Sequence, residues 1–271
     1  MHDRTATPEK DVETLRRGYD ADGFCVIPKL FPGPLIARAA AAAEAVARGE
    51  TDTGLLPRLR EGGQDGERQT LVKVAEPHNA SHDLRRLIIC PQPWRTIATI
   101  TSARVLQVWA VDLFIKRTEP TARANIGWHQ DGPFAPYWRG DIFTVWIALS
   151  DATLDASPLR YIRGSHRLGP LQRADLFRTD LDLALAGLPA GFDAHKVAVR
   201  VPPGGIAMHQ RDTVHASGPN ISARSRVALA VRVRTDRCEI TENVSQVAHL
   251  DDRELAPVVF AGRSPAGAAE R

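Results

Sequence analysis

The second half of the chain contains a series of short apolar segments separated by turn residues. The segments are rich in Val, Ile, Trp, Phe and Leu, and Gly, Pro, Asn and Asp lie between them. The first group of residues favours extended backbone and the second favours turns. Eight short strands at this spacing are typical of a β-sandwich or β-barrel. The expected strands are 106–116, 126–131, 143–149, 159–162, 195–201, 206–209, 213–216 and 227–234.

The first hundred residues show mainly helical patterns. The segment 8–20 is helix-like and leads into a short apolar strand at 24–27. Pro34 then opens an alanine-rich helix over 35–48, and a further helical region ends near residue 100. These patterns predict a mainly β protein with an α-helical support.

We expect the chain to form a single domain over residues 1–271, because no linker or repeat divides it. Its expected parts are a helical N-terminal support over about 8–100, a β core over about 104–236 and a C-terminal extension over 237–271. Residues 51–69 are polar and lack periodicity, which indicates a loop. A loop of this length is either a lid over a binding site or a floppy insertion.

Composition limits the partners that we expect. The net charge is +3, and no basic tract alternates with aromatic residues as in proteins that bind single-stranded nucleic acid. No apolar run is long enough to cross a bilayer, and the N-terminal residues lack a signal-peptide core. The sparse cysteines, Cys25, Cys90 and Cys238, fit a reducing compartment. We therefore expect a cytoplasmic protein that binds neither nucleic acid nor membranes, and no heptad pattern indicates its oligomeric state.

A His-x-Asp triplet, His129-Gln130-Asp131, lies in one of the expected strands. Alternate residues of a strand point to the same face, so the imidazole and the carboxylate should share one face. With the distant His215 they would form a two-His, one-carboxylate triad, which leaves coordination positions open and suits Fe(II). A second triplet, His249-Leu250-Asp251, lies in a polar segment with no later histidine, so we expect no metal there.

Arg226 lies at the head of the last expected strand. Its same-face neighbours Ala228 and Ala230 are small enough to leave space beside a guanidinium, which can bind a carboxylate through two parallel hydrogen bonds. Ser217, on the same face as His215, is a candidate for a third donor. The alternative is that Arg226 lies at a sheet edge and pairs with a surface acid.

Several motifs, in this order and spacing, resemble the phytanoyl-CoA dioxygenase family of Fe(II)- and 2-oxoglutarate-dependent oxygenases. They are D-G-F-C-V-I at 22–27, W-H-Q-D-G at 128–132, V-W-I-A-L at 145–149, G-S-H at 164–166 and H-x-S-G-P-N-x-S-x-x-x-R at 215–226. The resemblance covers roughly residues 18–235. The chain departs from the family in the turn before Leu159 and at Arg163, where the family commonly has proline.

The resemblance implies a double-stranded β-helix, a jelly-roll or cupin-like core with helices packed on one sheet. It assigns His129, Asp131 and His215 to the iron. It assigns Arg226 and Ser217 to the far carboxylate of 2-oxoglutarate. As further contacts to this cosubstrate or its pocket it implies Lys73, Trp146 and Gln107. For these three, the alternatives are a solvated lysine, a core tryptophan and a sheet glutamine.

The reaction that the resemblance implies consumes O2 and 2-oxoglutarate, releases succinate and CO2, and oxidises a substrate C–H bond. Related halogenases replace the carboxylate ligand with a small residue, whereas this chain keeps Asp131, so hydroxylation, desaturation or another oxidation is expected. We expect a small metabolite as substrate, such as an amino acid derivative or a natural-product intermediate. The candidate substrate residues are Phe134, Tyr137, Trp138, Trp109 and Arg139.

Two functions of other classes remain open. One is a redox-neutral metal enzyme on the same jelly-roll, an isomerase or a hydrolase, in which Arg226 would not bind 2-oxoglutarate. The other is a non-catalytic module that binds a small molecule and retains no metal. The intact triad together with Arg226 favours the oxygenase. His166 and His209 are interpreted as structural or surface residues that do not bind the metal.

Overall fold

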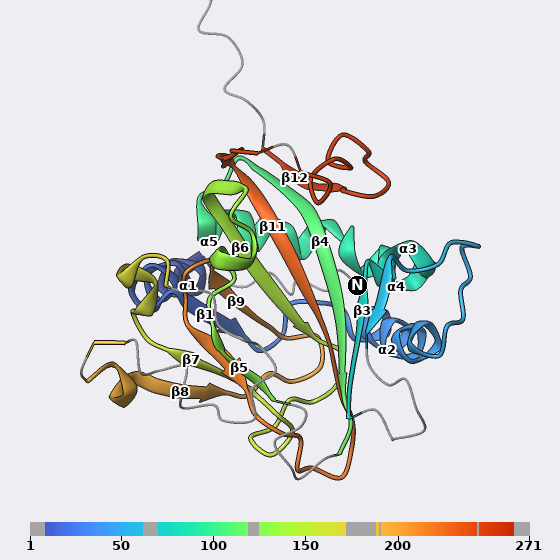
Figure 1. Cartoon of the computed structure of the whole chain (residues 1–271), viewed down its shortest axis with the longest axis horizontal. Coiled ribbons are helices and arrows are strands. Elements are labelled where there is room, and N and C mark those ends of the chain that lie inside the picture. The colour runs from blue at the N-terminus through green and yellow to red at the C-terminus, as the bar shows by residue number, and fades with distance from the viewer. Residues whose placement is uncertain are drawn as a thin grey trace, which may run out of the picture.

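A computed structural model describes residues 9–61, 70–118, 125–171, 188–189, 191–242 and 244–262. The named strands form one eight-stranded and one four-stranded sheet, and all the pairings between them are antiparallel (Figure 1). The larger sheet has the order β1-β9-β6-β11-β4-β3-β2, with β12 also paired to β4, and the smaller has the order β5-β10-β7-β8. The strands are β1 Phe24–Ile27, β2 Leu59–Glu61, β3 Leu71–Ala75, β4 Val105–Lys116, β5 Ile126–His129, β6 Trp138–Ala148, β7 Leu159–Ile162, β8 Lys196–Val199, β9 Ile206–Gln210, β10 His215–Ser217, β11 Arg226–Ile240 and β12 Val258–Ala261.

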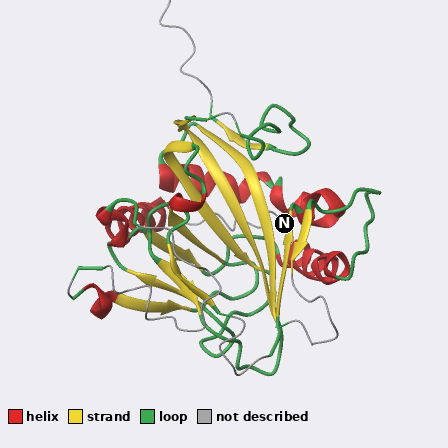
Figure 2. Ribbon diagram, in the orientation of Figure 1, coloured by secondary structure: helices red, strands yellow, loops and turns green. Residues whose placement is uncertain are grey.

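Helices pack on the outer face of the larger sheet (Figure 2). They are α1 Glu9–Asp22, α2 Gly33–Ala47, α3 Pro77–Ala80, α4 His82–Ile88 and α5 Pro91–Thr101. Helix α2 has a proline in its first turn and buries Ala39 and Ala43 completely. Because these side chains lie one turn apart on the same face, α2 packs closely against α4 and β3.

Strand alternation divides the larger sheet into two faces. On β11, the side chains of Val227, Leu229 and Val231 enter the core beneath the helices. Arg226 and Arg232 lie on the opposite face, which borders a cavity between the two sheets. The face that meets the helices is therefore apolar, and the chemically active side chains lie on the other face.

The expected mainly β architecture with a helical support is confirmed, and β4 to β11 correspond to the eight expected strands. Several boundaries differ from the prediction. Strand β6 begins at Trp138, ahead of the expected start at residue 143, and β5 ends at His129 and does not reach Asp131. The N-terminal and C-terminal parts also contribute β1, β2, β3 and β12 to the larger sheet.

The expected 51–69 loop contains the short strand β2, and residues 62–69 lie outside the described residues. The prediction of a lid there stays a prediction. Within the described residues, no helix has both the length and the apolar character that a membrane span requires.

Candidate metal centre

The two histidines of the predicted triad face each other across neighbouring strands. Strands β5 and β10 pair His129 directly with His215. The Nδ1 atom of His129 lies 2.7 Å from the carbonyl oxygen of Gly127, and that of His215 lies 3.0 Å from the carbonyl oxygen of Thr213. A carbonyl can only accept a hydrogen bond, so each Nδ1 carries the proton. Each Nε2 therefore keeps a lone pair that can bind a metal.

Asp131, the third residue of the predicted triad, lies after the end of β5. Its backbone is helical, with φ −72° and ψ −33°. The prediction that strand alternation aligns Asp131 with His129 is wrong, because β5 ends two residues earlier. The side chains nevertheless meet, since Oδ1 of Asp131 lies 3.9 Å from Nε2 of both His129 and His215. One ligand atom of each residue lies within 4.8 Å of the others, as a facial triad requires.

Burial and neighbouring charges set the protonation of these residues. Burial lowers the pKa of His129, and burial together with His129 and His209 lowers the pKa of His215 well below its usual range. Burial opposes ionisation of Asp131, yet the hydrogen bond from His209 and the nearby His215 hold its pKa well below the usual range. Two neutral imidazoles and one carboxylate are the states in which these groups bind a divalent metal.

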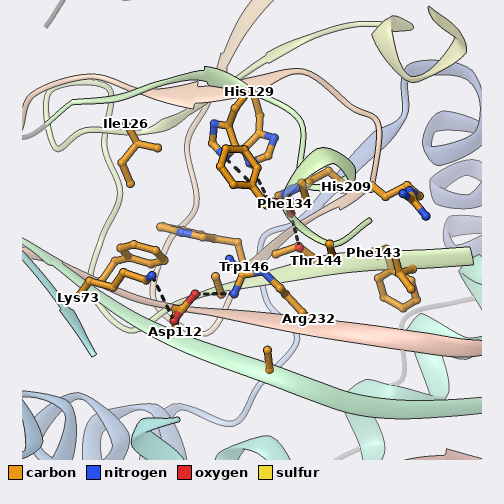
Figure 3. A pocket seen from close by; sticks show the side chains of 18 of the residues that line it. Lys73, Asp112, Ile126, His129, Phe134, Phe143, Thr144, Trp146, His209 and Arg232 are labelled. Carbon is orange, nitrogen blue, oxygen red and sulfur yellow. Dashed lines mark hydrogen bonds and ion pairs between the residues drawn. The ribbon is translucent and has the colours of Figure 1, made fainter. Parts of the chain in front are cut away.

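The triad borders a cavity of about 280 Å³ that lies between the two sheets. Figure 3 shows His129 and Phe134 on one side of this cavity and Lys73, Trp146 and Arg232 on the other. Seven of the predicted cosubstrate and substrate residues line it. They are Arg226, Ser217, Lys73, Trp146, Phe134, Tyr137 and Trp109.

Arg226 is a buried cation that faces this cavity. Its side chain is 1% exposed, and its Nε and Nη2 atoms have no hydrogen-bond partner in the described part of the chain. The guanidinium carbon lies 5.2 Å from the ring centroid of Trp146. Burial lowers the pKa of Arg226 to about 9, so it is still cationic at neutral pH. Two unpartnered nitrogen atoms on a buried cation are costly unless an anion binds them, so Arg226 fits the carboxylate of a ligand.

The family model for phytanoyl-CoA dioxygenase (PhyH) matches residues 19–228. The chain belongs to the phytanoyl-CoA dioxygenase family. The resemblance of the sequence motifs to this family of iron- and 2-oxoglutarate-dependent enzymes is thereby confirmed. Phytanoyl-CoA dioxygenase 1 of Oryza sativa subsp. japonica is 32% identical over 113 residues, which are 41% of this chain and 40% of the rice protein. The match thus spans less than half of that relative.

Solved structures share the fold of this phytanoyl-CoA dioxygenase family member. The non-heme alpha ketoglutarate dependent carbocyclase SnoK from nogalamycin biosynthesis has a TM-score of 0.71 at 23% identity, over 92% of this chain and 96% of SnoK. The epimerase SnoN, in complex with Fe3+, alpha ketoglutarate and nogalamycin RO, has a TM-score of 0.70 at 20% identity, over 97% and 93%. EctD from S. alaskensis has a TM-score of 0.64 at 18% identity, over 87% and 79%. These likenesses confirm the predicted jelly-roll fold.

Lys116, which was not predicted as a site residue, holds Ser217 in place. Lys116 is fully buried, and its Nζ donates to Oγ of Ser217 at 2.7 Å and to the carbonyl oxygens of Ser217 and Gly218 at 3.1 and 2.9 Å. The Ser217 hydroxyl accepts this bond, so its own hydrogen can be donated to a ligand. Burial and the charge of Arg226 lower the pKa of Lys116 well below its usual range.

Lys73 belongs to a cluster of charged groups on the cavity face of the larger sheet. Its Nζ lies 3.9 Å from Oδ1 of Asp112, and Arg232 donates to the other oxygen of the same carboxylate. The sequence analysis predicted Lys73 but neither partner. Arg232 lies on the same face of β11 as Arg226, so alternation along the strand is a signal that identifies it.

Gln107 does not lie where the family resemblance implied. It does not line the cavity, and its amide nitrogen donates to the carbonyl oxygens of Leu250 and Ala256 at 2.7 and 2.9 Å. Its amide oxygen accepts from Nε of Arg234 at 2.7 Å. Gln107 therefore ties the C-terminal segment to β4, and we no longer assign it to the cosubstrate.

Two of the candidate substrate residues also lie outside the cavity lining. Trp138 is buried against Trp109 and Tyr137, behind the wall that these two rings form. Arg139 is exposed and pairs with Glu239 on the neighbouring strand. Trp138 and Arg139 are neighbours on β6 and point to opposite faces, so they are excluded differently: Trp109 and Tyr137 lie beside Trp138, and Arg139 points to solvent. We therefore no longer assign Trp138 and Arg139 to the substrate.

Proposed function

We propose that the protein is an Fe(II)- and 2-oxoglutarate-dependent dioxygenase that oxidises an unactivated C–H bond of a small metabolite, with release of succinate and CO2. The observation that carries this proposal is the position of Arg226. Its unpartnered guanidinium lines the same cavity as His129, Asp131 and His215. A redox-neutral metal enzyme or a non-catalytic binding module does not require a buried arginine that binds the carboxylate of a ligand beside the metal.

Each of these residues has a distinct task in the proposal. His129, Asp131 and His215 would hold the iron, and Arg226 with the Ser217 hydroxyl would bind the far carboxylate of 2-oxoglutarate. When bound, iron and cosubstrate supply the oxidising chemistry with O2. The protein orients the cosubstrate and keeps water from the reacting atoms.

The remaining part of the cavity supports a small substrate with an apolar body. Phe134, Tyr137 and Trp109 supply aromatic surface there, and the Asp112–Arg232 pair supplies charged groups of both signs. We propose an amino acid derivative or a natural-product intermediate as the substrate. The origin of SnoK and SnoN in nogalamycin biosynthesis supports this class.

We propose that the enzyme acts in the cytoplasm as one domain. Cys25, Cys90 and Cys238 are free thiols, which a reducing compartment preserves. Segments near both ends of the described chain add strands to the larger sheet, which supports a single folding unit.

The test of the cosubstrate site is spectroscopic. Anaerobic apoprotein with Fe(II) and 2-oxoglutarate is expected to develop the weak visible charge-transfer band of the chelate, which fades when O2 is admitted. Arg226→Gln should need a 2-oxoglutarate concentration higher by roughly 10- to 100-fold, because a bidentate charged contact is lost. Arg139→Gln, an exposed arginine, should behave like the wild type.

Each contrary result points to a different alternative. Iron binding without the band would favour the redox-neutral enzyme, and failure to bind iron would favour the binding module. The substrate class is tested by succinate release with amino acid derivatives, polycyclic natural-product intermediates and long acyl thioesters. A response to the thioesters alone would contradict the small-metabolite assignment.

A further inference from the structure

The carboxylate of Asp131 is held from the opposite sheet. Its Oδ2 accepts hydrogen bonds from Oγ1 of Thr144 at 2.6 Å and from Nε2 of His209 at 3.2 Å. Thr144 lies on β6 and His209 on β9, and the register of these strands pairs the two residues directly. Figure 3 shows Thr144 and His209 close together beside the cavity. Both donors are buried, at 4% and 2% exposure.

The orientation of His209 is fixed by a third residue. A carboxylate can only accept, so Nε2 of His209 carries the hydrogen that Asp131 receives. In the neutral imidazole Nδ1 is then an acceptor, and the Tyr161 hydroxyl, 3.0 Å away, donates to it. Tyr161 lies on β7 in the smaller sheet and is fully buried, with its ring stacked 4.2 Å from that of Phe24. Tyr161 on the smaller sheet therefore donates to His209 on the larger sheet, and His209 in turn donates to Asp131.

These contacts distinguish the two oxygens of Asp131. Oδ2 receives two hydrogen bonds, which occupy its two lone pairs. Oδ1 faces Nε2 of His129 and Nε2 of His215 at equal distances of 3.9 Å. Only Oδ1 keeps a lone pair that points toward the space between the two imidazoles.

We propose that Thr144 and His209 are positioning residues that make Asp131 a ligand through one oxygen only. A carboxylate that binds through both oxygens takes two positions of a six-coordinate metal, and two imidazoles take two more. Binding through Oδ1 alone leaves three positions for small molecules instead of two. The inference rests on the metal site of the proposed function but not on the oxygenase reaction.

The competing explanation is that Thr144 and His209 are ordinary buried polar residues whose hydrogen bonds only stabilise the fold. That explanation predicts a change in stability without a change in metal binding. Asp131 lies outside β5 and has no strand to fix it, so its orientation depends on these two donors. Metal affinity and the coordination spectrum therefore separate the two explanations.

The experiment uses the full-length apoprotein and Co(II), whose visible spectrum reports coordination number and geometry. Thr144→Val removes the hydroxyl while keeping the side-chain shape, and His209→Leu removes the imidazole donor. Each is expected to weaken Co(II) binding roughly 10- to 100-fold, as the loss of outer-shell partners does at other metal sites. Each is also expected to alter the Co(II) spectrum, because one lone pair of Oδ2 becomes free to bind.

Conservative and control variants complete the set. Thr144→Ser keeps the hydroxyl and should restore both affinity and spectrum. Tyr161→Phe should change them in the same direction as His209→Leu but less. Thr101→Val removes a buried threonine hydroxyl that bonds within α5, so it should lower stability without affecting Co(II).

Each outcome decides one question. If the wild-type apoprotein binds no Co(II), the metal site of the proposed function fails. If it does bind, while folded Thr144→Val and His209→Leu match it in affinity and spectrum, the positioning role is overturned. If His209→Leu does not fold, the comparison of Thr144→Val with Thr144→Ser decides alone.

Discussion

Glu76 is a buried carboxyl group in a strained position at the edge of the cavity. Its φ of 56° lies in the left-handed region, which a residue with a side chain rarely adopts, and its side chain lines the cavity. Burial raises the pKa of Glu76 to about 7. Burial lowers the pKa of the neighbouring His78 to about 4, so this imidazole is neutral and supplies no counter-charge. At neutral pH, Glu76 therefore offers a ligand both its acid and its anionic form.

The raised pKa of Glu76 makes the stability of the folded protein depend on pH. The ordinary pKa of a glutamate is 4.5, and that of folded Glu76 is about 7, so its stabilising contribution is complete below pH 4.5 and is lost as the pH rises through 7. Glu76→Gln removes this loss, because the amide never ionises. Relative to the wild type, we expect the variant to gain about 2 to 3 kcal/mol in free energy of unfolding between pH 5 and pH 8.

Urea unfolding of the apoprotein at both pH values measures this change. The exposed Glu242→Gln serves as the control and should show no such difference. An equal effect of Glu76→Gln at pH 5 and pH 8 would show that Glu76 ionises normally in the folded protein.

Long strands with regular apolar alternation could be predicted from the sequence. Strands β4 and β11 are of this kind, and alternation placed Arg226 on the correct face. The same alternation places Lys116 and Arg232 on the face of Arg226. Neither was predicted as a site residue, because a charged residue in a strand is usually exposed. Strand β6 was predicted to start too late, because Trp138 and Gly140 follow a segment rich in glycine, proline and aromatic residues that is typical of a loop.

The part of the site that could not be predicted depends on contacts between sheets. A strand pattern places the His209 side chain on one face of its sheet. It does not say which residue of the other sheet lies opposite that face. The bond from His209 to Asp131 joins positions 78 residues apart. The position of Gln107 depends likewise on the C-terminal segment, whose path after residue 240 has no regular periodicity. Local patterns carry no information about such pairings.

Helix α2 gives a prediction about packing. Ala43 is completely buried where α2 meets α4 and β3, so a larger side chain has no space there. We expect Ala43→Leu to lower the free energy of unfolding by about 1 to 3 kcal/mol. Ala41→Leu makes the same change on the exposed face of the helix and should have little effect. Urea unfolding of both variants measures the difference, and equal losses would place the packing face of α2 elsewhere.

For the whole molecule, the proposed ligands connect the two sheets. His129 and His215 belong to the smaller sheet, whereas Arg226 and the donors to Asp131 belong to the larger one. A metal and 2-oxoglutarate bound together would thus join both sheets through one centre. Binding only to the folded chain must then raise its apparent stability.

This coupling gives a thermal prediction. With Co(II) and 2-oxoglutarate at about 100 times their dissociation constants, each ligand should add about 2.7 kcal/mol, or roughly 5 to 10 °C in Tm for a chain of this size. Removal of the metal with EDTA should reverse the shift. His129→Ala should melt at the same temperature with and without Co(II) in differential scanning calorimetry. A shift in that variant would mean that the metal binds elsewhere.

The direct pairing of His129 with His215 also links the proposed metal site to the register of the smaller sheet. If β10 slipped by one residue against β5, His215 would turn to the other face of the sheet and the two imidazoles would no longer meet. The same short strand has β7 as its other neighbour, so such a slip would disturb both pairings. Only the observed alignment brings the two imidazoles together, so a metal bound by both would favour this register over the slipped one.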